Sequence, residues 1–251
     1  MTPARDLIDT LAGLEPIKTW SLIVTLFGDA TDTDIPAGAI RLLLDHIGIQ
    51  PGATRVALHR LKGDGWIVAT KAGREVNYAL SEPGAAETHA VYRDIYSSED
   101  KFPNGWILRL INGQSSETPL PANAIPVSKD CLLMPAAQAE AGKDHLNLPL
   151  RPASLPDWLA ERLIDQHQQA LARRTAKAIA MASQLGNMPK IDRAAIRLLI
   201  LHHWRKLALR PASWAHVNLC PDGAVAQLHR AATHYLANTD PVELTRLDEP
   251  G

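Results

Sequence analysis

The residues of this sequence best suited to a chemical task form a stripe of basic side chains in its first quarter. Arg55, His59 and Lys62 recur at i, i+4 and i+7, so on a helix they lie on one side. The opposite side of the same helix carries residues that it would bury: Thr54, Ala57, Leu58 and Leu61. Arginine pairs bidentately with O6 and N7 of guanine, and further cations hold phosphates. The stripe, with Val56 and Arg60 beside it, is therefore typical of a helix that reads the major groove of DNA.

A second basic group follows at the tip of a predicted hairpin. Residues 66–70 are rich in β-branched side chains and residues 75–80 alternate with period two, so both predict strands. The connection between the two predicted strands contains Lys71 and Arg74, on either side of Gly73. At the tip of a hairpin these two side chains can reach phosphates or the minor groove. A charged stripe also marks the solvated face of any amphipathic helix, but a basic-tipped hairpin directly after it favours DNA contact.

The order of the elements around the stripe predicts the fold of the first domain. Helical patterns cover about residues 17–27 and 36–46, and the latter has a proline in its first turn. A tight turn, Gly48-Ile49-Gln50-Pro51, separates them from the helix of about residues 52–62. Helix, short turn, helix and hairpin in succession is the order of a winged helix-turn-helix domain. We assign residues 1–97 to this domain.

The rest of the chain divides into a small β-rich part and a helical part. Short apolar runs predict strands at residues 106–111, 131–134 and 145–148, whereas residues 112–130 read mostly as loop. Helical periodicity then predicts helices over residues 157–186, over 192–209 with Asp192 as N-cap, and over 223–236. The expected fold class is α+β and mostly helical, with a small β-containing middle domain at residues 98–152 and a helical C-terminal domain at 153–251.

Composition and charge exclude several classes of protein. The 251 residues are 46% hydrophobic and 21% charged, which favours two or three small globular domains. The formal net charge is −1, so contact with nucleic acid must come from local patches such as residues 51–74. The two cysteines, the lack of a signal-peptide pattern and the absence of an apolar run of about 20 residues predict a cytoplasmic protein without a membrane span.

No other group of residues predicts a cofactor or a reaction. His202 and His203 are adjacent, so on a helix they point about 100° apart, and His216 with Cys220 makes only a pair. A zinc site needs three or four ligands, so we expect no metal. The sequence holds no Walker motif, no glycine-rich phosphate loop after a strand and no nucleophile elbow, so we expect no enzyme and no cofactor.

Residues 151–210 hold 11 basic and 4 acidic side chains, which leaves two interpretations open. The cations are either the solvated faces of helices or a site for an anion. Two groups at helical spacing are the candidates for such a site: Arg173, Arg174 and Lys177, and Arg205, Lys206 and Arg210.

Several segments resemble the PaaX-type transcriptional repressors of phenylacetate degradation. Residues 21–29 (SLIVTLFGD) are similar to that family's first helix, and residues 55–66 (RVALHRLKGDGW) to its recognition helix and the entry to its wing. Arg74 with residues 78–81 (YALS) is similar to the second wing strand. Residues 198–210 (LLILHHWRKLALR) are similar to part of the family's helical C-terminal domain.

The resemblance implies a ferredoxin-like middle domain and a response to an acyl-coenzyme A, whose phosphates would suit the two basic groups. Residues 112–123 (NGQSSETPLPAN) are too short and too rich in proline to supply a crossover helix. The middle domain is therefore either a reduced ferredoxin-like domain or a different fold.

We predict a transcriptional regulator that binds a double-stranded DNA operator through Arg55, Val56, His59, Arg60, Lys62, Lys71 and Arg74. One recognition helix reads few base pairs, which favours a homodimer. The resemblance implies repression, released by a small anionic effector such as an aryl-acyl-coenzyme A. The alternative is a winged-helix module for protein contacts that does not read DNA sequence.

Overall fold

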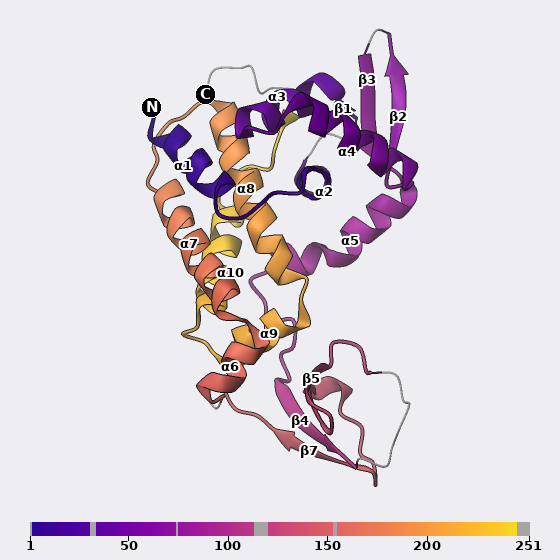
Figure 1. Ribbon diagram of the computed structural model, residues 1–251, viewed down its shortest axis with the longest axis vertical. Helices are drawn as coiled ribbons and strands as arrows, with labels where there is room; N and C mark the ends of the chain where they lie inside the picture. Colours follow the sequence, from indigo (N-terminus) through magenta and orange to yellow (C-terminus); the bar gives the residue numbers. More distant parts are fainter. Residues whose placement is uncertain (1, 31–33, 74, 113–119, 153–154, 245–251) are drawn as a thin grey trace. The chain divides into compact units, whose positions relative to one another are not determined.

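The computed structural model describes residues 2–30, 34–73, 75–112, 120–152 and 155–244, and it divides them into two compact units (Figure 1). Unit 1 is drawn from residues 1–96, 174–205 and 231–251, and unit 2 from residues 97–173 and 206–230. The described part is α+β and mostly helical, with two small antiparallel sheets, which confirms this part of the predicted fold class; the winged helix-turn-helix stays a prediction.

The described residues of the N-terminal part of unit 1 form five helices. They are α1 (Pro3–Ala12), α2 (Thr19–Asp29), α3 (Ala37–Ile47), α4 (Pro51–Gly63) and α5 (Glu82–Tyr96). Gly48 ends α3 with a φ of 97°, a left-handed conformation that glycine adopts without strain. Pro51 then begins α4, where its missing N–H costs no helical hydrogen bond. The turn between α3 and α4 is therefore determined by local sequence.

A three-stranded sheet joins the hairpin that follows α4 to a short strand that precedes α3. Its strands are β1 (Ile35–Pro36), β2 (Ile67–Ala72) and β3 (Glu75–Leu80), in the order β1-β3-β2. The two strands of the predicted hairpin are thus present. The backbone of α5 approaches the start of β2 so closely that a Cβ on Gly84 would lie 2.2 Å from the carbonyl oxygen of Trp66. Glycine at this position lets α5 pack against the base of the hairpin.

Three long helices contribute residues to both units: α7 (Gln166–Ala182), α8 (Lys190–Ala208) and α10 (Ala224–Ala237). Within unit 1, α8 is attached to α2 by a buried ion pair. Arg197 donates from Nε to Oδ2 of Asp29 at 2.7 Å and from Nη2 to Oδ1 at 2.8 Å, and both side chains are about 2% exposed or less. The two residues are 168 positions apart in the sequence.

The remaining polar atoms of this pair also have partners. Nη1 of Arg197 donates to the carbonyl oxygens of Leu236 and Thr239, and the hydroxyl of Tyr96 donates to Oδ1 of Asp29 at 2.9 Å. Burial by itself would lower the pKa of Arg197, but the hydrogen bonds and charge of Asp29 raise it above its ordinary value. Burial, and then the charge of Asp29, raise the pKa of Tyr96. Asp29 and Arg197 therefore join α2, α5, α8 and the end of α10.

Unit 2 contains a four-stranded antiparallel sheet. Its strands are β4 (Trp106–Ile111), β5 (Ile125–Ser128), β6 (Cys131–Pro135) and β7 (His145–Pro149), in the order β5-β6-β4-β7. The links from β4 to β5 and from β6 to β7 each cross a neighbouring strand. Within the described residues of these links the helical element is a single 3-10 turn, η1 (Ala136–Gln138). A reduced ferredoxin-like domain stays a prediction, which this strand order supports.

Unit 2 also holds α6 (Asp157–Leu163) and α9 (Pro211–Leu219). Trp106 at the start of β4 donates from its indole N–H to Oδ1 of Asn218 on α9 at 2.8 Å. The indole N–H of Trp214 donates to the carbonyl of Ala208 at 2.7 Å. Both tryptophans are 1% exposed and anchor α9 in the core of this unit.

Three sequence-based predictions are wrong. Pro36 does not lie in the first turn of α3, because it belongs to β1 and the helix begins at Ala37. Asp192 is not an N-cap, because α8 begins at Lys190 and the carboxylate of Asp192 instead lies 2.6 Å from Nε2 of His46 on α3. The segment that forms α9 was not predicted to be helical. The division into units also differs from the predicted domain boundaries, because unit 1 includes residues 174–205 of the expected C-terminal domain. Those boundaries, 1–97, 98–152 and 153–251, stay predictions.

We expect Asp29→Asn to destabilise the protein by about 3–5 kcal/mol, because it leaves the buried Arg197 guanidinium without its counter-charge. The matched control is Asp9→Asn, which removes an exposed aspartate–arginine pair with Arg5. That control should cost at most about 1 kcal/mol. Urea unfolding followed by tryptophan fluorescence measures both values. Equal losses in the two variants would contradict the central role of Asp29.

Candidate nucleic-acid interface

Helix α4 separates its apolar and basic residues cleanly. Thr54, Ala57, Leu58 and Leu61 are buried, as predicted, and α4 packs against α2 and α3. Arg55, His59 and Lys62 are exposed on the other side. No hydrogen bond or ion pair links these three side chains to another residue in the part of the chain that the structure describes. The stripe predicted from the sequence therefore faces solvent with its donors unused.

The two residues beside the stripe have different surroundings. Val56 is 67% exposed, which is unusual for an apolar side chain in a folded core element. The guanidinium of Arg60 lies 5.6 Å from the centre of the Trp20 ring on α2, and its Nε lies 3.5 Å from Oδ2 of Asp64. Arg60 thus leans towards α2, whereas Val56 projects into solvent.

The hairpin carries Lys71 near the end of β2. Gly73 has a φ of 64°, a left-handed conformation that the tight connection requires. Lys71 is exposed, and Arg74 lies outside the described residues. At the base of the hairpin the indole N–H of Trp66 donates to Glu87 at 3.0 Å, and the Ser81 hydroxyl donates to the carbonyl of Gly65 at 2.6 Å. The hairpin is therefore anchored to α5 while its tip remains accessible.

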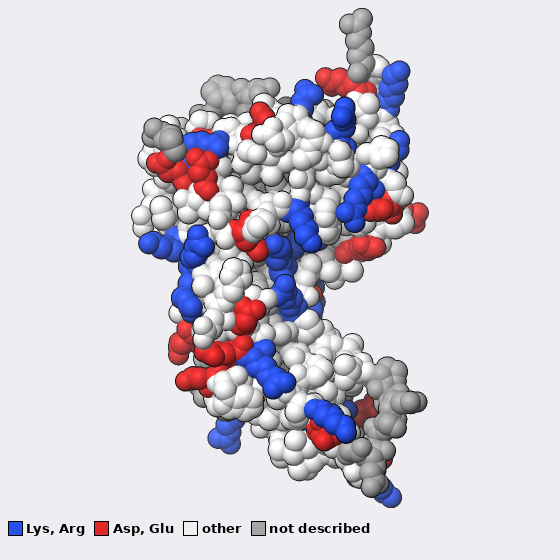
Figure 2. Space-filling view, viewed as in Figure 1, with Lys and Arg blue, Asp and Glu red and all other residues white. Residues whose placement is uncertain are grey.

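A groove of about 470 Å³ runs beside the start of α4. Arg41 on α3 and Arg55 on α4 both line it, together with Tyr78 of β3. The Thr54 hydroxyl, also in its wall, is buried without a hydrogen-bond partner among the described residues. Sequence reasoning missed Arg41, although its place on the exposed side of the preceding helix could have indicated it. Figure 2 shows Lys and Arg side chains gathered over the part of unit 1 that holds α4 and the hairpin, with a few carboxylates among them.

The six basic residues predicted to bind an effector differ in exposure and belong to different units. Arg173, Arg174, Lys177 and Arg210 are exposed, whereas Arg205 and Lys206 are half-buried. Burial lowers the pKa of Arg205. Arg174, Lys177 and Arg205 belong to unit 1, and Arg173, Lys206 and Arg210 to unit 2. None of the six lines the groove beside α4 or the two cavities beside Arg193 and Asp240. A common anion site formed by these residues stays a prediction.

Two other features bear on the candidate functions. Among the described residues, no three His, Cys, Asp or Glu side chains are arranged to hold a metal ion. None of the helices in the same part of the chain is long and apolar enough to span a bilayer.

Comparison with known proteins identifies the segment that carries the stripe and the hairpin. Residues 18–84 match the model of the PaaX-like protein family. The predicted resemblance is confirmed by this match and by a curated relative, the transcriptional repressor PaaX of Escherichia coli (strain K12). The two chains are 33% identical over 107 residues, which are 41% of this chain and 34% of the repressor. The matched residues of this chain include α2, α3, α4 and both strands of the hairpin.

Proposed function

We propose that this protein is a DNA-binding transcriptional regulator whose α3, α4, β2 and β3 form a winged helix-turn-helix. The observation that carries the proposal is the exposed side of α4, where Arg55, His59 and Lys62 have no partner among the described residues. They lie within the segment that matches the PaaX-like family. Solvated helix faces commonly pair their charges along the helix, and this one leaves its donors available for bases and phosphates.

In the proposed complex α4 enters the major groove. Arg55 is the residue for guanine, because its two donors fit O6 and N7, and exposed Val56 is suited to a thymine methyl group. His59 lies one turn further along α4, on the same side. Lys62 and Arg60 hold phosphates towards the end of the helix. Lys71 and Arg74 hold the backbone on the side of the wing.

The groove beside the start of α4 adds a phosphate contact that the sequence analysis did not include. Arg41 and Arg55 lie in its wall, and so does Gly52, the first residue of α4 with a backbone N–H to offer. A phosphate there would meet a cation, one backbone donor and the partial positive charge of a helix N-terminus. Contacts of this kind position a recognition helix without reading sequence.

Repression is the proposed direction of regulation, because the curated relative is a transcriptional repressor. The effector that we propose for release is a small anion such as an aryl-acyl-coenzyme A. What supports it is the resemblance to the family, the predicted cations on α7 and α8, and Arg210, which directly precedes α9. A homodimer is proposed because two recognition helices are needed to read an operator of useful length.

Arg55→Ala should abolish the preference for one base pair, at a cost of about 1–3 kcal/mol on the specific operator, while binding to random DNA changes little. The exposed side chain of Arg55 makes the fold insensitive to this change. Selection from a random DNA pool, followed by binding titrations, measures the effect, and Arg162→Ala on α6 is the control. Equal losses on specific and random DNA would assign Arg55 to phosphates. If the unchanged protein binds no DNA, the winged helix serves protein contacts instead.

Arg74→Ala and Lys71→Ala should each weaken binding to all DNA sequences about equally. Each should also reduce the slope of log K against log salt by about one unit, because one phosphate contact is lost. Titrations between about 50 and 200 mM salt give the slope. A slope that stays at the value of the unchanged protein would remove that residue from the DNA interface.

The full chain should sediment at twice the chain mass and bind a palindromic operator with two chains per duplex. Analytical ultracentrifugation of the free protein and of the complex decides this. The measurement needs the whole chain, because truncation near residue 98 would remove Arg197 and leave Asp29 unpaired. A monomer in both states would contradict the proposed dimer.

A further inference from the structure

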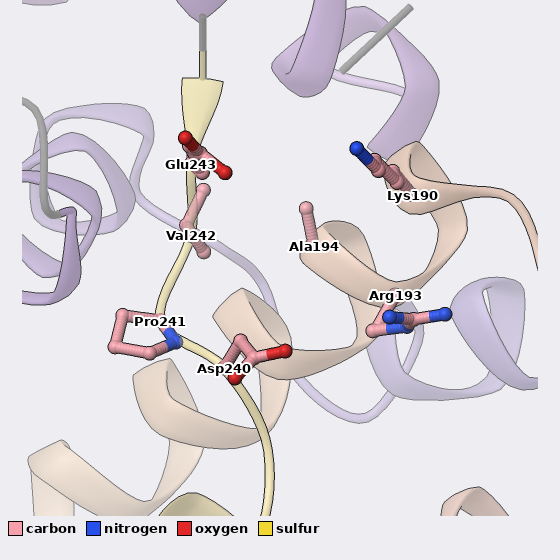
Figure 3. Close-up of a pocket in the computed structure, with 7 residues that line it drawn as sticks. All are labelled: Lys190, Arg193, Ala194, Asp240, Pro241, Val242 and Glu243. Carbon is pink, nitrogen blue, oxygen red and sulfur yellow. The ribbon is translucent and has the colours of Figure 1, made fainter. Parts of the chain in front are cut away.

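Unit 1 contains an open cleft of about 580 Å³ at some distance in sequence from the DNA-reading elements. Its walls come from the end of α7, the connection to α8, the first turn of α8, the end of α10 and residues 238–240. A smaller cavity of about 100 Å³ shares Arg193 and Asp240 with it (Figure 3). Sites for single small molecules fall in the range of about 300–1,000 Å³, and the cleft lies within it.

Two opposite charges line both cavities from different elements. In Figure 3 Arg193 projects from α8 and Asp240 from the segment that follows α10. No ion pair joins them, or joins either to another charged residue, in the described part of the chain. Among the described residues the one hydrogen bond of the Arg193 side chain is long, from Nη2 to the carbonyl of Met188 at 3.5 Å. Each charge is therefore available to a ligand.

The other walls are suited to an uncharged body of modest size. Leu185, Met188 and Tyr235 supply apolar or aromatic surface, and the side chains of Asn187 and Asn238 add amide groups. Tyr235 is 7% exposed, and burial raises the pKa of its hydroxyl, so the group stays neutral. An anion alone would be attracted by Arg193 and repelled by Asp240, whereas a molecule that carries both charges satisfies both residues.

Both walls of the cleft connect to the helices on which α4 packs. Thr239 lines the cleft, and its hydroxyl accepts from Nη1 of Arg197 at 2.6 Å. Arg197 in turn holds Asp29 at the end of α2. Asp192 is the neighbour of Arg193 in the chain, and its carboxylate contacts His46 at the end of α3. A ligand between Arg193 and residues 238–240 would thus contact Thr239, which accepts from Arg197, and the chain neighbour of Asp192.

We propose that this cleft binds a small zwitterion of amino-acid size, with its carboxylate on Arg193, its ammonium on Asp240 and its side chain over Leu185, Met188 and Tyr235. This site differs from the acyl-coenzyme A site proposed above, because it contains none of those six basic residues. The binding itself does not depend on DNA. Its regulatory consequence, a change in operator affinity, rests on the proposed function and requires that the ligand bind the free and DNA-bound conformations with different affinity.

Calorimetry and thermal unfolding of the full chain test the site with the twenty protein amino acids at millimolar concentration. At least one amino acid with an apolar or aromatic side chain should bind and raise the melting temperature. For phenylalanine the matched probes are 3-phenylpropionate, which lacks the ammonium, and phenethylamine, which lacks the carboxylate. For whichever amino acid binds, removal of either charged group should weaken binding roughly tenfold or more. If no amino acid binds, or if the analogue without an ammonium binds equally well, the proposal is overturned.

Variants assign the two charges to their residues. Arg193→Gln should weaken binding of the zwitterion about tenfold or more. In Asp240→Asn the amino acid and its analogue without an ammonium group should bind with the same affinity. Arg162→Gln on α6 is the control and should leave the affinity unchanged. The melting temperatures of the unliganded variants show whether they fold. A folded Arg193→Gln variant with full affinity would contradict the assignment.

Operator titrations with and without the ligand then separate the site from the regulation. If the ligand shifts operator affinity in the unchanged protein and not in Arg193→Gln, the result supports both the ligand site and its regulatory link to DNA binding. Ligand binding without any shift in operator affinity overturns the regulatory link and supports the site. A protein that binds the zwitterion but no DNA supports the site and overturns the proposed function.

Discussion

The buried ion pair between Asp29 and Arg197 is the interaction on which the arrangement of unit 1 depends. A charge inside a protein is tolerated when it is paired and when its remaining hydrogen-bonding atoms are satisfied, and both conditions are met here. The carboxylate receives Arg197, the Tyr96 hydroxyl and, at 3.3 Å, the backbone N–H of Val242. Four segments that are remote in sequence therefore share one electrostatic centre. This explains why α8 belongs to the same compact unit as the N-terminal helices.

The same centre gives the proposed reading helix a rigid support. Helix α4 packs on α2 and α3, and each of these is held by a polar contact to α8. For α2 the contact is Asp29 with Arg197, and for α3 it is His46 with Asp192, whose Nε2 and Oδ1 atoms are 2.6 Å apart. Contacts of this kind do not by themselves make a regulated protein, because coupling requires two arrangements that a ligand distinguishes. They do provide the physical connection through which such a ligand would act.

Local sequence patterns predicted the parts of this fold whose stability is local. The i, i+4, i+7 spacing around Arg55 predicted both faces of α4, and the Gly-containing turn predicted the hairpin. The pattern failed for α9, a short helix whose buried residues, such as Trp214, Ala215 and His216, do not form one stripe. It failed in another way for Asp29, Arg197 and Asp192, because nothing in the sequence distinguishes a buried ionic residue from an exposed one. Their partners lie more than 140 residues away.

The basic segment 151–210 shows why charge counted by segment is a weak guide to function. Its arginines have at least three different roles in the structure. Arg197 forms a buried ion pair with Asp29. Arg205 is half-buried, and burial lowers its pKa. Arg193 lines a cleft that Asp240 also lines. Helix α4 carries fewer cations, yet Arg55 and Lys62 are exposed, aligned and without a partner among the described residues. Affinity for a polyanion such as DNA depends on cations that are available on one surface. By that criterion α4 is a better candidate for the DNA-binding surface than residues 151–210.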